Sequence, residues 1–480
     1  MKGKKIKIAG VLLISTMLAM TSLAACGTKS ASTSTSSSSS TTVSTSDMFT
    51  KRDLDSSYDE SKATKITLSD SKTTVSGNGA KYSSENGVNT VTITKEGTYI
   101  LSGELNGQIV VDTDKTAKVQ IVLNGVTISS ESTAAIQVKQ ADKVFLTLAK
   151  GSENTLTENG EFASDDTSTV DGVIFSKDDL TINGSGSLKV TTENGHGIVS
   201  KDDLVIASGT IDITSSGHGL QGKDSVRIAD GTITISSSND GIHSENKDDS
   251  RLGFVYIKDG TIKISAADDG IHSGNNVTID GGTITVSESS EGIEGQSIDI
   301  NGGKIDVTSS DDGLNAASSS SSSDNTNQGF GGPGGPGGPG GPGGGDMSVD
   351  ENAYIKITGG EIHISAEGDG VDSNGNFEVT GGILYVEGPS RGGNAALDFT
   401  GTGTISGGLV IATDNGSMLQ SLTAQSGMNT VVLNVSRSSA SEIVVKDSSG
   451  NVLGTLKPSK SFNNIIVSGA GVSESTISYN

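Results

Sequence analysis

The chain has 480 residues, enough for roughly two to four ordinary domains, yet only 32% are hydrophobic, 3% are aromatic and 66 are glycine. One cysteine excludes a disulfide framework within the chain, and 33 basic against 57 acidic residues give a formal charge of −24, which argues against binding nucleic acid. The protein therefore has to fold while burying little apolar surface per residue.

The N-terminus has the pattern of a targeting segment. Four lysines precede an apolar run over residues 8–20 that is too short for a comfortable membrane span. The next motif, Leu23-Ala24-Ala25-Cys26, resembles the lipobox of bacterial lipoproteins, in which the signal is cut before a cysteine that is then lipidated. We expect a signal peptide over residues 1–25 and a lipid anchor at Cys26, holding the protein on the extracellular face of the bacterial cell membrane. The alternative is a cytosolic protein with one buried cysteine.

A tether follows the cysteine. Residues 28–46 are almost wholly serine and threonine and could bury no apolar surface, so residues 26–60 are expected to be a flexible tether and residues 61–480 the folded domain. Removing residues 1–25 takes away four of the 33 basic residues and no acidic one, so the mature charge is 29 − 57 = −28.

A repeat organises the domain. Its marker is a glycine followed by an aliphatic residue, at spacings of 25, 22, 22, 29, 22, 21 and 57 residues. The eight markers are Gly172-Val173, Gly197-Ile198, Gly219-Leu220, Gly241-Ile242, Gly270-Ile271, Gly292-Ile293, Gly313-Leu314 and Gly370-Val371. The underlying period is about 22 residues, and the longest interval contains a Gly/Pro/Ser-rich insertion over residues 316–350, which we expect to be a loop expelled from the repeat.

Each unit carries short alternating runs, such as residues 277–279 and 283–286, that are rich in β-branched residues and broken at Gly-Gly or Asp-Gly. Short strands at this period predict an all-β fold, a parallel β-helix in which coils of about 22 residues stack as a solenoid. A sandwich of hairpins is the alternative, but it does not explain why one motif recurs in the same register.

Aligning the markers turns the chain into columns. The residue after each glycine is aliphatic and predicts an inward ladder, whereas acids gather one place before and two places after glycine from Asp240 onward. Strands of one sheet lie about 4.8 Å apart, where two carboxylates repel by roughly 3.5 kcal/mol at an effective dielectric near 20. Calcium ions bound between coils would relieve this repulsion, since calcium takes six to eight oxygen ligands. The predicted metal ligands are Asp240, Asp268, Asp269, Glu291, Glu294, Asp311, Asp312, Asp369 and Asp372.

Other interpretations of these columns remain open. Any single Asp-Gly pair is also ordinary turn chemistry, in which glycine supplies a positive φ. The histidines form two short ladders, His196 with His218 and His243 with His272, which are expected to be stacked turn imidazoles and, as an alternative, a zinc site. Three lysines, Lys177, Lys201 and Lys223, each precede an aspartate and could be surface ion-pair partners or a catalytic base.

The repeat Val-x-Ile-x-Gly-Gly-x-Ile-x-Ile-x-x-x-x-Asp-Gly-Ile, in residues 276–293 and 354–371, resembles a family of bacterial surface proteins. A C-terminal segment over residues 450–468 resembles the family's closing motif. The resemblance implies a right-handed parallel β-helix, similar to calcium-dependent pectate lyases, that binds cellulose and pectic acid sugars with calcium. It also implies a calcium role for the acids of the Asp-Gly positions, although His196 and His218 depart from the acidic pattern.

The sequence thus predicts calcium-dependent binding of plant cell-wall polysaccharides, acidic pectic sugars and cellulose, without turnover, by a monomer. No constellation of lysine or arginine stands out as the base that a lyase needs to remove the proton α to a uronate carboxylate. A calcium-dependent pectate lyase is nevertheless one alternative. A passive surface adhesin or spacer, in which calcium only adds rigidity, is another.

Overall fold

The computed structural model describes residues 48–85, 87–162, 170–318, 348–437 and 442–480, which all fall within one compact unit of the chain. The expected signal peptide over residues 1–25, the anchor Cys26 and most of the insertion over residues 316–350 lie outside the described residues. Across the described ranges no helix has the length and apolar character to cross a membrane, and the helix found there is one 3₁₀ turn, η2 (Glu474–Thr476).

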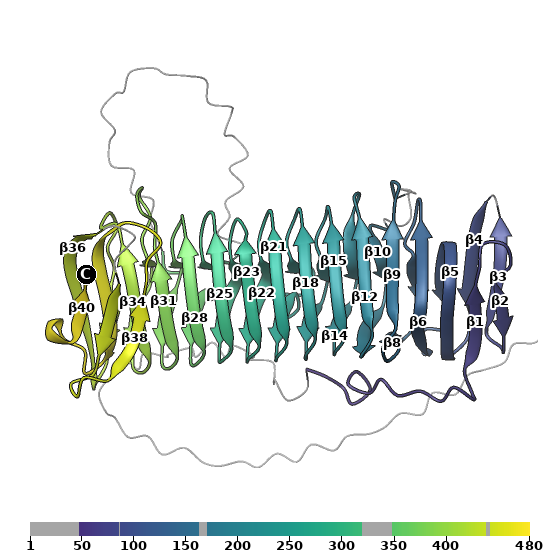
Figure 1. Ribbon diagram of the computed structural model, residues 1–480, viewed down its shortest axis with the longest axis horizontal. Coiled ribbons are helices and arrows are strands. Elements are labelled where there is room, and N and C mark those ends of the chain that lie inside the picture. The colour runs from purple at the N-terminus through teal and green to yellow at the C-terminus, as the bar shows by residue number, and fades with distance from the viewer. Residues whose placement is uncertain (1–47, 86, 163–169, 319–347, 438–441) are drawn as a thin grey trace, which may run out of the picture. The chain divides into compact units, whose positions relative to one another are not determined.

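The described unit is all-β, and most of its strands pair in parallel with the strand that lies one repeat later along the chain. Ile198 lies beside Leu220, and Leu220 lies beside Ile242. We call one passage of the chain through three successive strands a coil, and the three sets of paired strands the first, second and third ladders. Figure 1 shows the coils following one another in chain order.

The bounds of the strands follow this organisation. The first ladder contains β7 (Ile136–Gln140), β10 (Gly172–Ser176), β13 (His196–Ser200), β16 (Leu220–Gly222), β19 (Ile242–Ser244), β26 (Leu314–Ala316), β29 (Val371–Ser373) and β32 (Leu397–Phe399). The second contains β8 (Lys143–Leu148), β11 (Asp179–Gly184), β14 (Asp203–Ile206), β17 (Ser225–Ile228), β20 (Phe254–Ile257), β27 (Tyr354–Ile357), β30 (Asn376–Val379), β33 (Gly403–Ile405) and β35 (Thr423–Ala424). The third contains β9 (Glu153–Glu158), β12 (Ser187–Thr192), β15 (Thr210–Ser215), β18 (Thr232–Ser237), β21 (Thr261–Ala266), β23 (Thr283–Glu288), β25 (Lys304–Ser309), β28 (Glu361–Ala366), β31 (Ile383–Glu387) and β34 (Leu409–Asp414). Two long strands, β22 (Ile271–Ile279) and β24 (Ile293–Ile300), serve the first and second ladders in turn.

Other strands close the two ends of the stack. At the N-terminal end these are β1 (Thr64–Leu68), β2 (Thr74–Ser76), β3 (Ala80–Glu85), β4 (Val88–Ile93), β5 (Gly97–Asp112) and β6 (Lys118–Ser130). At the C-terminal end, β39 (Phe462–Ala470) pairs antiparallel with β34 and with β36 (Met428–Arg437). A separate three-stranded sheet holds β37 (Ile443–Lys446), β38 (Val452–Leu456) and β40 (Ile477–Tyr479).

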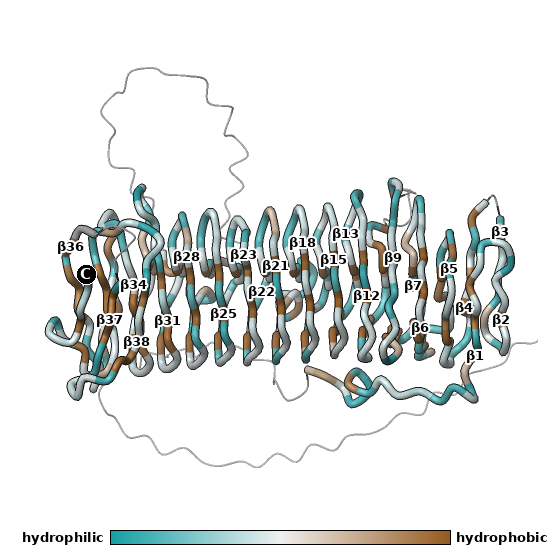
Figure 2. Tube along the Cα trace, viewed as in Figure 1, coloured by the Kyte–Doolittle hydropathy of each residue, from teal (hydrophilic) through white to brown (hydrophobic). Residues whose placement is uncertain are grey.

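The inward aliphatic ladder predicted from the markers is confirmed from Ile198 to Val371, where every member is fully buried in one continuous core. Hydrophobic residues recur along each coil in Figure 2. The same column continues beyond the markers, to Ile109 and Ile136 on one side and Leu397 on the other. The predicted alignment of Val173 with Ile198 is wrong by one residue, because these coils pair with an offset of 24 residues, Ile174 beside Ile198.

The marker glycines are required for a reason other than the predicted positive φ. From Gly197 to Gly370 none has a φ in the left-handed region. A Cβ on Gly241 would instead lie 2.7 Å from the carbonyl oxygen of Gly270 in the next coil, closer than van der Waals contact allows. Positive φ occurs at the turns between the second and third ladders, for example at Gly282 with φ +92°. Close stacking of successive coils therefore explains the marker, and turn conformation explains the second set of glycines.

Residues 48–57 lie against the second ladder. Asp53 is buried, and its carboxylate forms an ion pair with Lys143 at 2.8 Å and accepts a hydrogen bond from Thr181 Oγ1 at 2.6 Å. The ring of Phe49 packs on Tyr256, with centroids 5.8 Å apart. The tether expected over residues 26–60 therefore does not reach residue 60, because its last residues have buried and charged partners on the domain.

Candidate functional site

The candidate site lies where each third-ladder strand turns back to the first ladder, at what we call the return turns (residues 238–241, 267–270, 289–292, 310–313 and 367–370). The residue before each glycine lies within the turn, and the second residue after the glycine points outward, since strand side chains alternate between faces. Successive outward residues pair in register over six coils. This column reads His243, His272, Glu294, Asn315, Asp372 and Asp398.

The structure brings seven of the nine predicted ligands into three groups whose possible ligand atoms lie within 4.8 Å of one another. These groups are His218–Asp240–His243, Asp269–Glu291–Glu294 and Asp312–Asp369–Asp372, and Asp240 also comes within reach of Asp269 and His272. The other two predicted ligands, Asp268 and Asp311, are exposed and belong to none of the groups.

The Asp312–Asp369–Asp372 group has the least compensated charge. None of its members forms an ion pair with a lysine, arginine or histidine in the described part of the chain. Asp312 Oδ1 accepts the backbone N–H of Asp369 at 2.6 Å, and Asp369 Oδ1 accepts that of Ala395, so backbone donors orient two of the carboxylates.

Burial raises the pKa of Asp312 and of Asp369 to about 6 and that of Asp372 to about 7, and neighbouring carboxylates add to each shift. One of these neighbours is Asp398, which sequence reasoning missed. Its coil begins with Ala396 rather than a marker glycine. The sequence nevertheless contains a signal for Asp398. An aliphatic residue followed by aspartate occurs in Val371-Asp372 and again in Leu397-Asp398.

A neutral oxygen lies beside this group without a partner. Asn315 pairs in register with Asp372, and its amide Nδ2 donates to Glu291 Oε2 at 2.8 Å. Its carbonyl Oδ1 is buried and accepts no hydrogen bond from the described residues. Three crowded carboxylates and an orphaned carbonyl oxygen are the donor set that a hard, oxygen-binding cation such as calcium prefers, so the residues present fit calcium.

The Asp269–Glu291–Glu294 group is partly compensated by an imidazole. His272 Nδ1 lies 3.1 Å from Asp269 Oδ2 and 2.5 Å from Glu294 Oε2. Burial alone would lower the pKa of His272, but these two hydrogen bonds outweigh it and raise the pKa to about 10. Burial and the charge of Glu294 still raise the pKa of Glu291 to about 8. One imidazolium therefore balances only part of the charge of this group.

The histidines form one continuous stack instead of the two short ladders predicted. The rings of His196, His218, His243 and His272 follow one another with centroids 4.9, 4.2 and 4.9 Å apart. The two predicted ladders meet because the ring of His218, one place before its glycine, stacks on the ring of His243, which lies two places after its own glycine and within β19. We call these four rings the imidazole stack. Burial and the neighbouring His218 lower the pKa of His196 to about 4, so that end of the stack is neutral.

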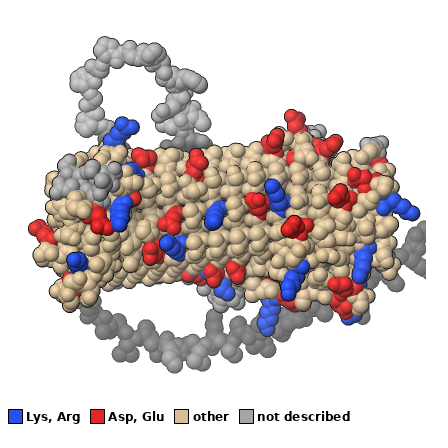
Figure 3. Space-filling model, in the orientation of Figure 1, with Lys and Arg blue, Asp and Glu red and all other residues tan. Residues whose placement is uncertain are grey.

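A further carboxylate group, Asp179–Asp202–Asp203, lies where the first ladder turns into the second. Lys143 lies 3.7 Å from Asp179, and Arg227 forms an ion pair with Asp203. Sequence reasoning noted the Lys-Asp pairs here but did not expect the acids to meet. Because cations already contact this group, it is a weaker candidate for an added ion. On the face shown in Figure 3, acidic and basic side chains are likewise interspersed.

The lysines considered as a catalytic base lie far along the stack from the uncompensated carboxylates. Lys201 pairs with Asp171 at 3.1 Å and Lys223 with Asp248 at 2.6 Å, and Lys177 is exposed. They follow β10, β13 and β16, several coils before the carboxylate group, in which Asp312 comes just before β26, Asp369 just before β29 and Asp372 within β29.

Comparison with known proteins gives a family and two similar proteins. A family model described as carbohydrate-binding domain-containing protein matches residues 87–327. A protein of that description from Acetivibrio thermocellus is 41% identical over 126 residues, which are 26% of this chain and 44% of that protein, so the match spans less than half of the relative. A solved structure described as a polysaccharide lyase-like protein from C. thermocellum, a gadolinium derivative, shares 33% identity with a TM-score of 0.44, covering 54% of this chain and 98% of the other.

The raised pKa values predict how stability depends on pH in calcium-free buffer. A carboxyl with a raised pKa keeps its proton in the folded chain where it has lost it in the unfolded chain, so its contribution to the free energy of unfolding falls as the pH rises from about 4 to about 7. We expect Asp372→Asn to lose less stability than the wild type over this range and to be more stable at pH 8 by roughly 1–2 kcal/mol, since one pKa unit corresponds to about 1.4 kcal/mol and the site is partly solvated.

Urea unfolding at several pH values measures this difference. Asp212→Asn removes the same charge from an exposed third-ladder side chain and should follow the wild type. If Asp372→Asn paralleled the wild type at every pH, the electrostatic account of this group would be wrong.

Proposed function

The chain belongs to the family of carbohydrate-binding domain-containing proteins, and from that premise we propose that it binds acidic cell-wall polysaccharides, through calcium held at its return turns, without cleaving them. The observation that carries the proposal is the Asp312–Asp369–Asp372 group, three partly buried carboxylates with no basic partner in the described residues. The group straddles the end of the matched region, with Asp312 inside it and the other two after it.

The three aspartates would hold the ion with their carboxylate oxygens, and Asn315 would add its orphaned carbonyl oxygen. When bound, calcium supplies a positive charge that protein and sugar carboxylates can share. The backbone amides of Asp369 and Ala395 hold two of the carboxylates in place, so little side-chain freedom is lost on binding.

Charge is also the reason to expect a bridging cation. A chain of formal charge −24 repels a polyuronate, and it has no tryptophan and only seven tyrosines to form the aromatic platforms that many sugar-binding faces use. Carboxylate groups repeated from coil to coil, about 4.8 Å apart, would offer an extended anionic glycan several anchoring points in a row. We propose that the three ladders wind as a right-handed parallel β-helix, which keeps these points on one line.

The same arrangement supports the proposal of binding without turnover. Removing a proton α to a uronate carboxylate needs a base beside the cation that acidifies it. The lysines considered for this role lie several coils from the candidate calcium site. They are exposed or form ion pairs with aspartates. Cellulose remains a second proposed ligand, which the same protein would take without the ion bridge.

Affinity electrophoresis through gels containing polygalacturonate tests the proposal. We expect the gel to retard the protein in calcium and not in chelator, and the double variant Asp369→Asn/Asp372→Asn to lose at least about tenfold in affinity, because it removes two ligand charges. The double variant Asp114→Asn/Asp212→Asn removes the same charge from exposed side chains and should bind as the wild type does.

Three outcomes separate the alternatives. Undiminished retardation in chelator would contradict calcium bridging. Calcium binding with no retardation in any glycan gel would favour a passive spacer. Release of an unsaturated uronide, followed by its ultraviolet absorbance, would make the protein a lyase.

We also propose that the protein works at the cell surface, with the signal peptide over residues 1–25 removed and Cys26 lipidated. In a bacterial host fed labelled palmitate, the wild type should carry the label and sediment with membranes, whereas Cys26→Ser should be unlabelled and released. Equal membrane association of both proteins would contradict the anchor.

A further inference from the structure

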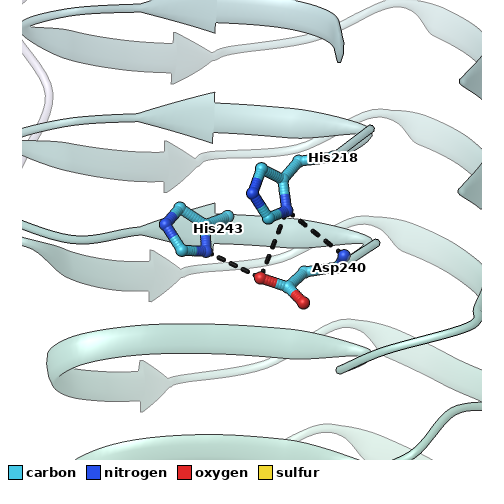
Figure 4. A group of neighbouring side chains, drawn as sticks. All are labelled: His218, Asp240 and His243. Carbon is cyan, nitrogen blue, oxygen red and sulfur yellow. Dashed lines mark hydrogen bonds and ion pairs between the residues drawn. The ribbon is translucent and has the colours of Figure 1, made fainter. Parts of the chain in front are cut away.

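One group in the return turns differs in kind from the others. In His218–Asp240–His243 two imidazoles face one carboxylate, whereas the candidate calcium group offers only oxygen atoms. Asp240 Oδ2 lies 3.2 Å from His218 Nδ1 and 2.6 Å from His243 Nδ1. Figure 4 marks both contacts with dashed lines. The side chains of His218 and His243 are each 15% exposed and that of Asp240 is 5% exposed, so the three donor groups converge in a mostly buried place with access from solvent.

The surrounding chain holds these three side chains in position. Asp240 Oδ1 accepts the backbone N–H of Asp269 at 3.2 Å, which leaves Oδ2 turned toward the two imidazoles. The rings of His218 and His243 lie in the middle of the imidazole stack, with His196 on one side and His272 on the other. Donor groups oriented in this way lose little conformational freedom when they bind a ligand.

Two hydrogen-bond acceptors, His218 Nδ1 and Asp240 Oδ2, face each other without a hydrogen between them. His218 Nδ1 accepts the backbone N–H of Asp240 at 3.2 Å, so this nitrogen carries a lone pair and no hydrogen. The same nitrogen faces Asp240 Oδ2 at 3.2 Å, which places two acceptors against each other. His243 Nδ1 is the one ring donor left to that oxygen. A cation between the carboxylate and the imidazoles would turn the opposed lone pairs into ligands.

The donor types identify the class of cation. Imidazole nitrogen with one carboxylate oxygen suits zinc and similar divalent ions, whereas calcium takes oxygen ligands. Zinc bonds of about 2.0–2.2 Å in a tetrahedron place neighbouring ligand atoms roughly 3.3–3.5 Å apart. The His218–Asp240 distance of 3.2 Å is close to this, and the His243–Asp240 distance of 2.6 Å belongs to a hydrogen bond that has to open.

We propose that His218, Asp240 and His243 form a zinc-class metal site, distinct from the oxygen-only carboxylate groups farther along the same edge. On binding, the proton of His243 Nδ1 leaves to solvent and the backbone N–H of Asp240 gives up its hydrogen bond to His218 Nδ1, so that the metal takes both lone pairs, with water in the fourth position. The two rings, stacked at 18°, turn toward each other so that both lone pairs meet the ion. Different divalent ions would then bind at different places along the stack, a zinc-class ion where imidazoles supply nitrogen and calcium where the ligands are all oxygen. This inference does not depend on the glycan-binding proposal.

Calorimetric titration of the full chain with zinc chloride, in a large excess of calcium, tests the site. We expect one zinc ion per chain with an affinity that calcium does not change, and a loss of at least about tenfold in His218→Gln, His243→Gln and Asp240→Asn. Cobalt(II) as a probe should give the visible absorption of a four-coordinate nitrogen and oxygen site, absent from the same variants.

Two control variants separate loss of a ligand from damage to the fold. His272→Gln breaks the imidazole stack but keeps all three donors, and should still bind zinc. His363→Gln removes the one histidine outside the stack, beside Glu361, and should bind as the wild type does. The proposal is overturned if His218→Gln/His243→Gln binds zinc as tightly as the wild type, if Asp312→Asn/Asp372→Asn abolishes zinc binding, or if the wild type binds none.

Discussion

Parallel pairing between successive coils places each residue about 4.8 Å from its counterpart in the next coil, and the other features of this protein depend on that spacing. Where the repeated residue is aliphatic, the spacing is favourable, and one continuous core runs from Ile66 to Ile466 although only 32% of the chain is hydrophobic. At the marker positions it demands glycine, because a Cβ on Gly241 would collide with the backbone of the next coil. The unusual composition is thus a consequence of stacking.

At the same spacing, like charges in successive coils repel each other, and the means of compensating this repulsion differ along the chain. Lys143 and Arg227 contact the carboxylates near Asp203, and His272 lies between Asp269 and Glu294. No such partner reaches Asp312, Asp369 or Asp372 in the described ranges, where burial and mutual repulsion raise the pKa of each carboxyl. Function is proposed at these aspartates because a bound cation would compensate their charge where no basic side chain of the described residues does.

Periodic residues allowed the core and much of the candidate site to be predicted. The aliphatic ladder from Ile198 to Val371 and the meeting of Asp312 with Asp369 follow from spacing alone, because pairing in register brings equal positions together. What spacing could not give were local offsets. Gly172 and Gly197 are 25 residues apart but their coils pair with an offset of 24, so Asp171 does not align with the residue before Gly197. The coil that contributes Asp398 has Ala396 where the others have the marker glycine, so the marker did not reveal it.

Contacts between different columns were equally hidden. His218 and His243 stack on each other although they hold different positions relative to their marker glycines. An alignment of the repeats on these glycines therefore places the two histidines in different columns. Asp53 contacts Lys143 and Thr181, which lie more than eighty residues later in the sequence. Asp53 precedes the repeat, so the periodicity does not predict these contacts. These interactions depend on side-chain direction and on packing of the N-terminal segment, neither of which is periodic.

The central claim is that uncompensated carboxylates in the return turns bind calcium. Hydrogen exchange followed by mass spectrometry, with and without calcium, tests it most directly, because peptides resolve one turn from another. The account predicts slower exchange on adding calcium in residues 310–315, 367–372 and 395–398, and little change in the turns between the second and third ladders. Exchange that calcium leaves unchanged, or slows equally in every coil, would contradict it.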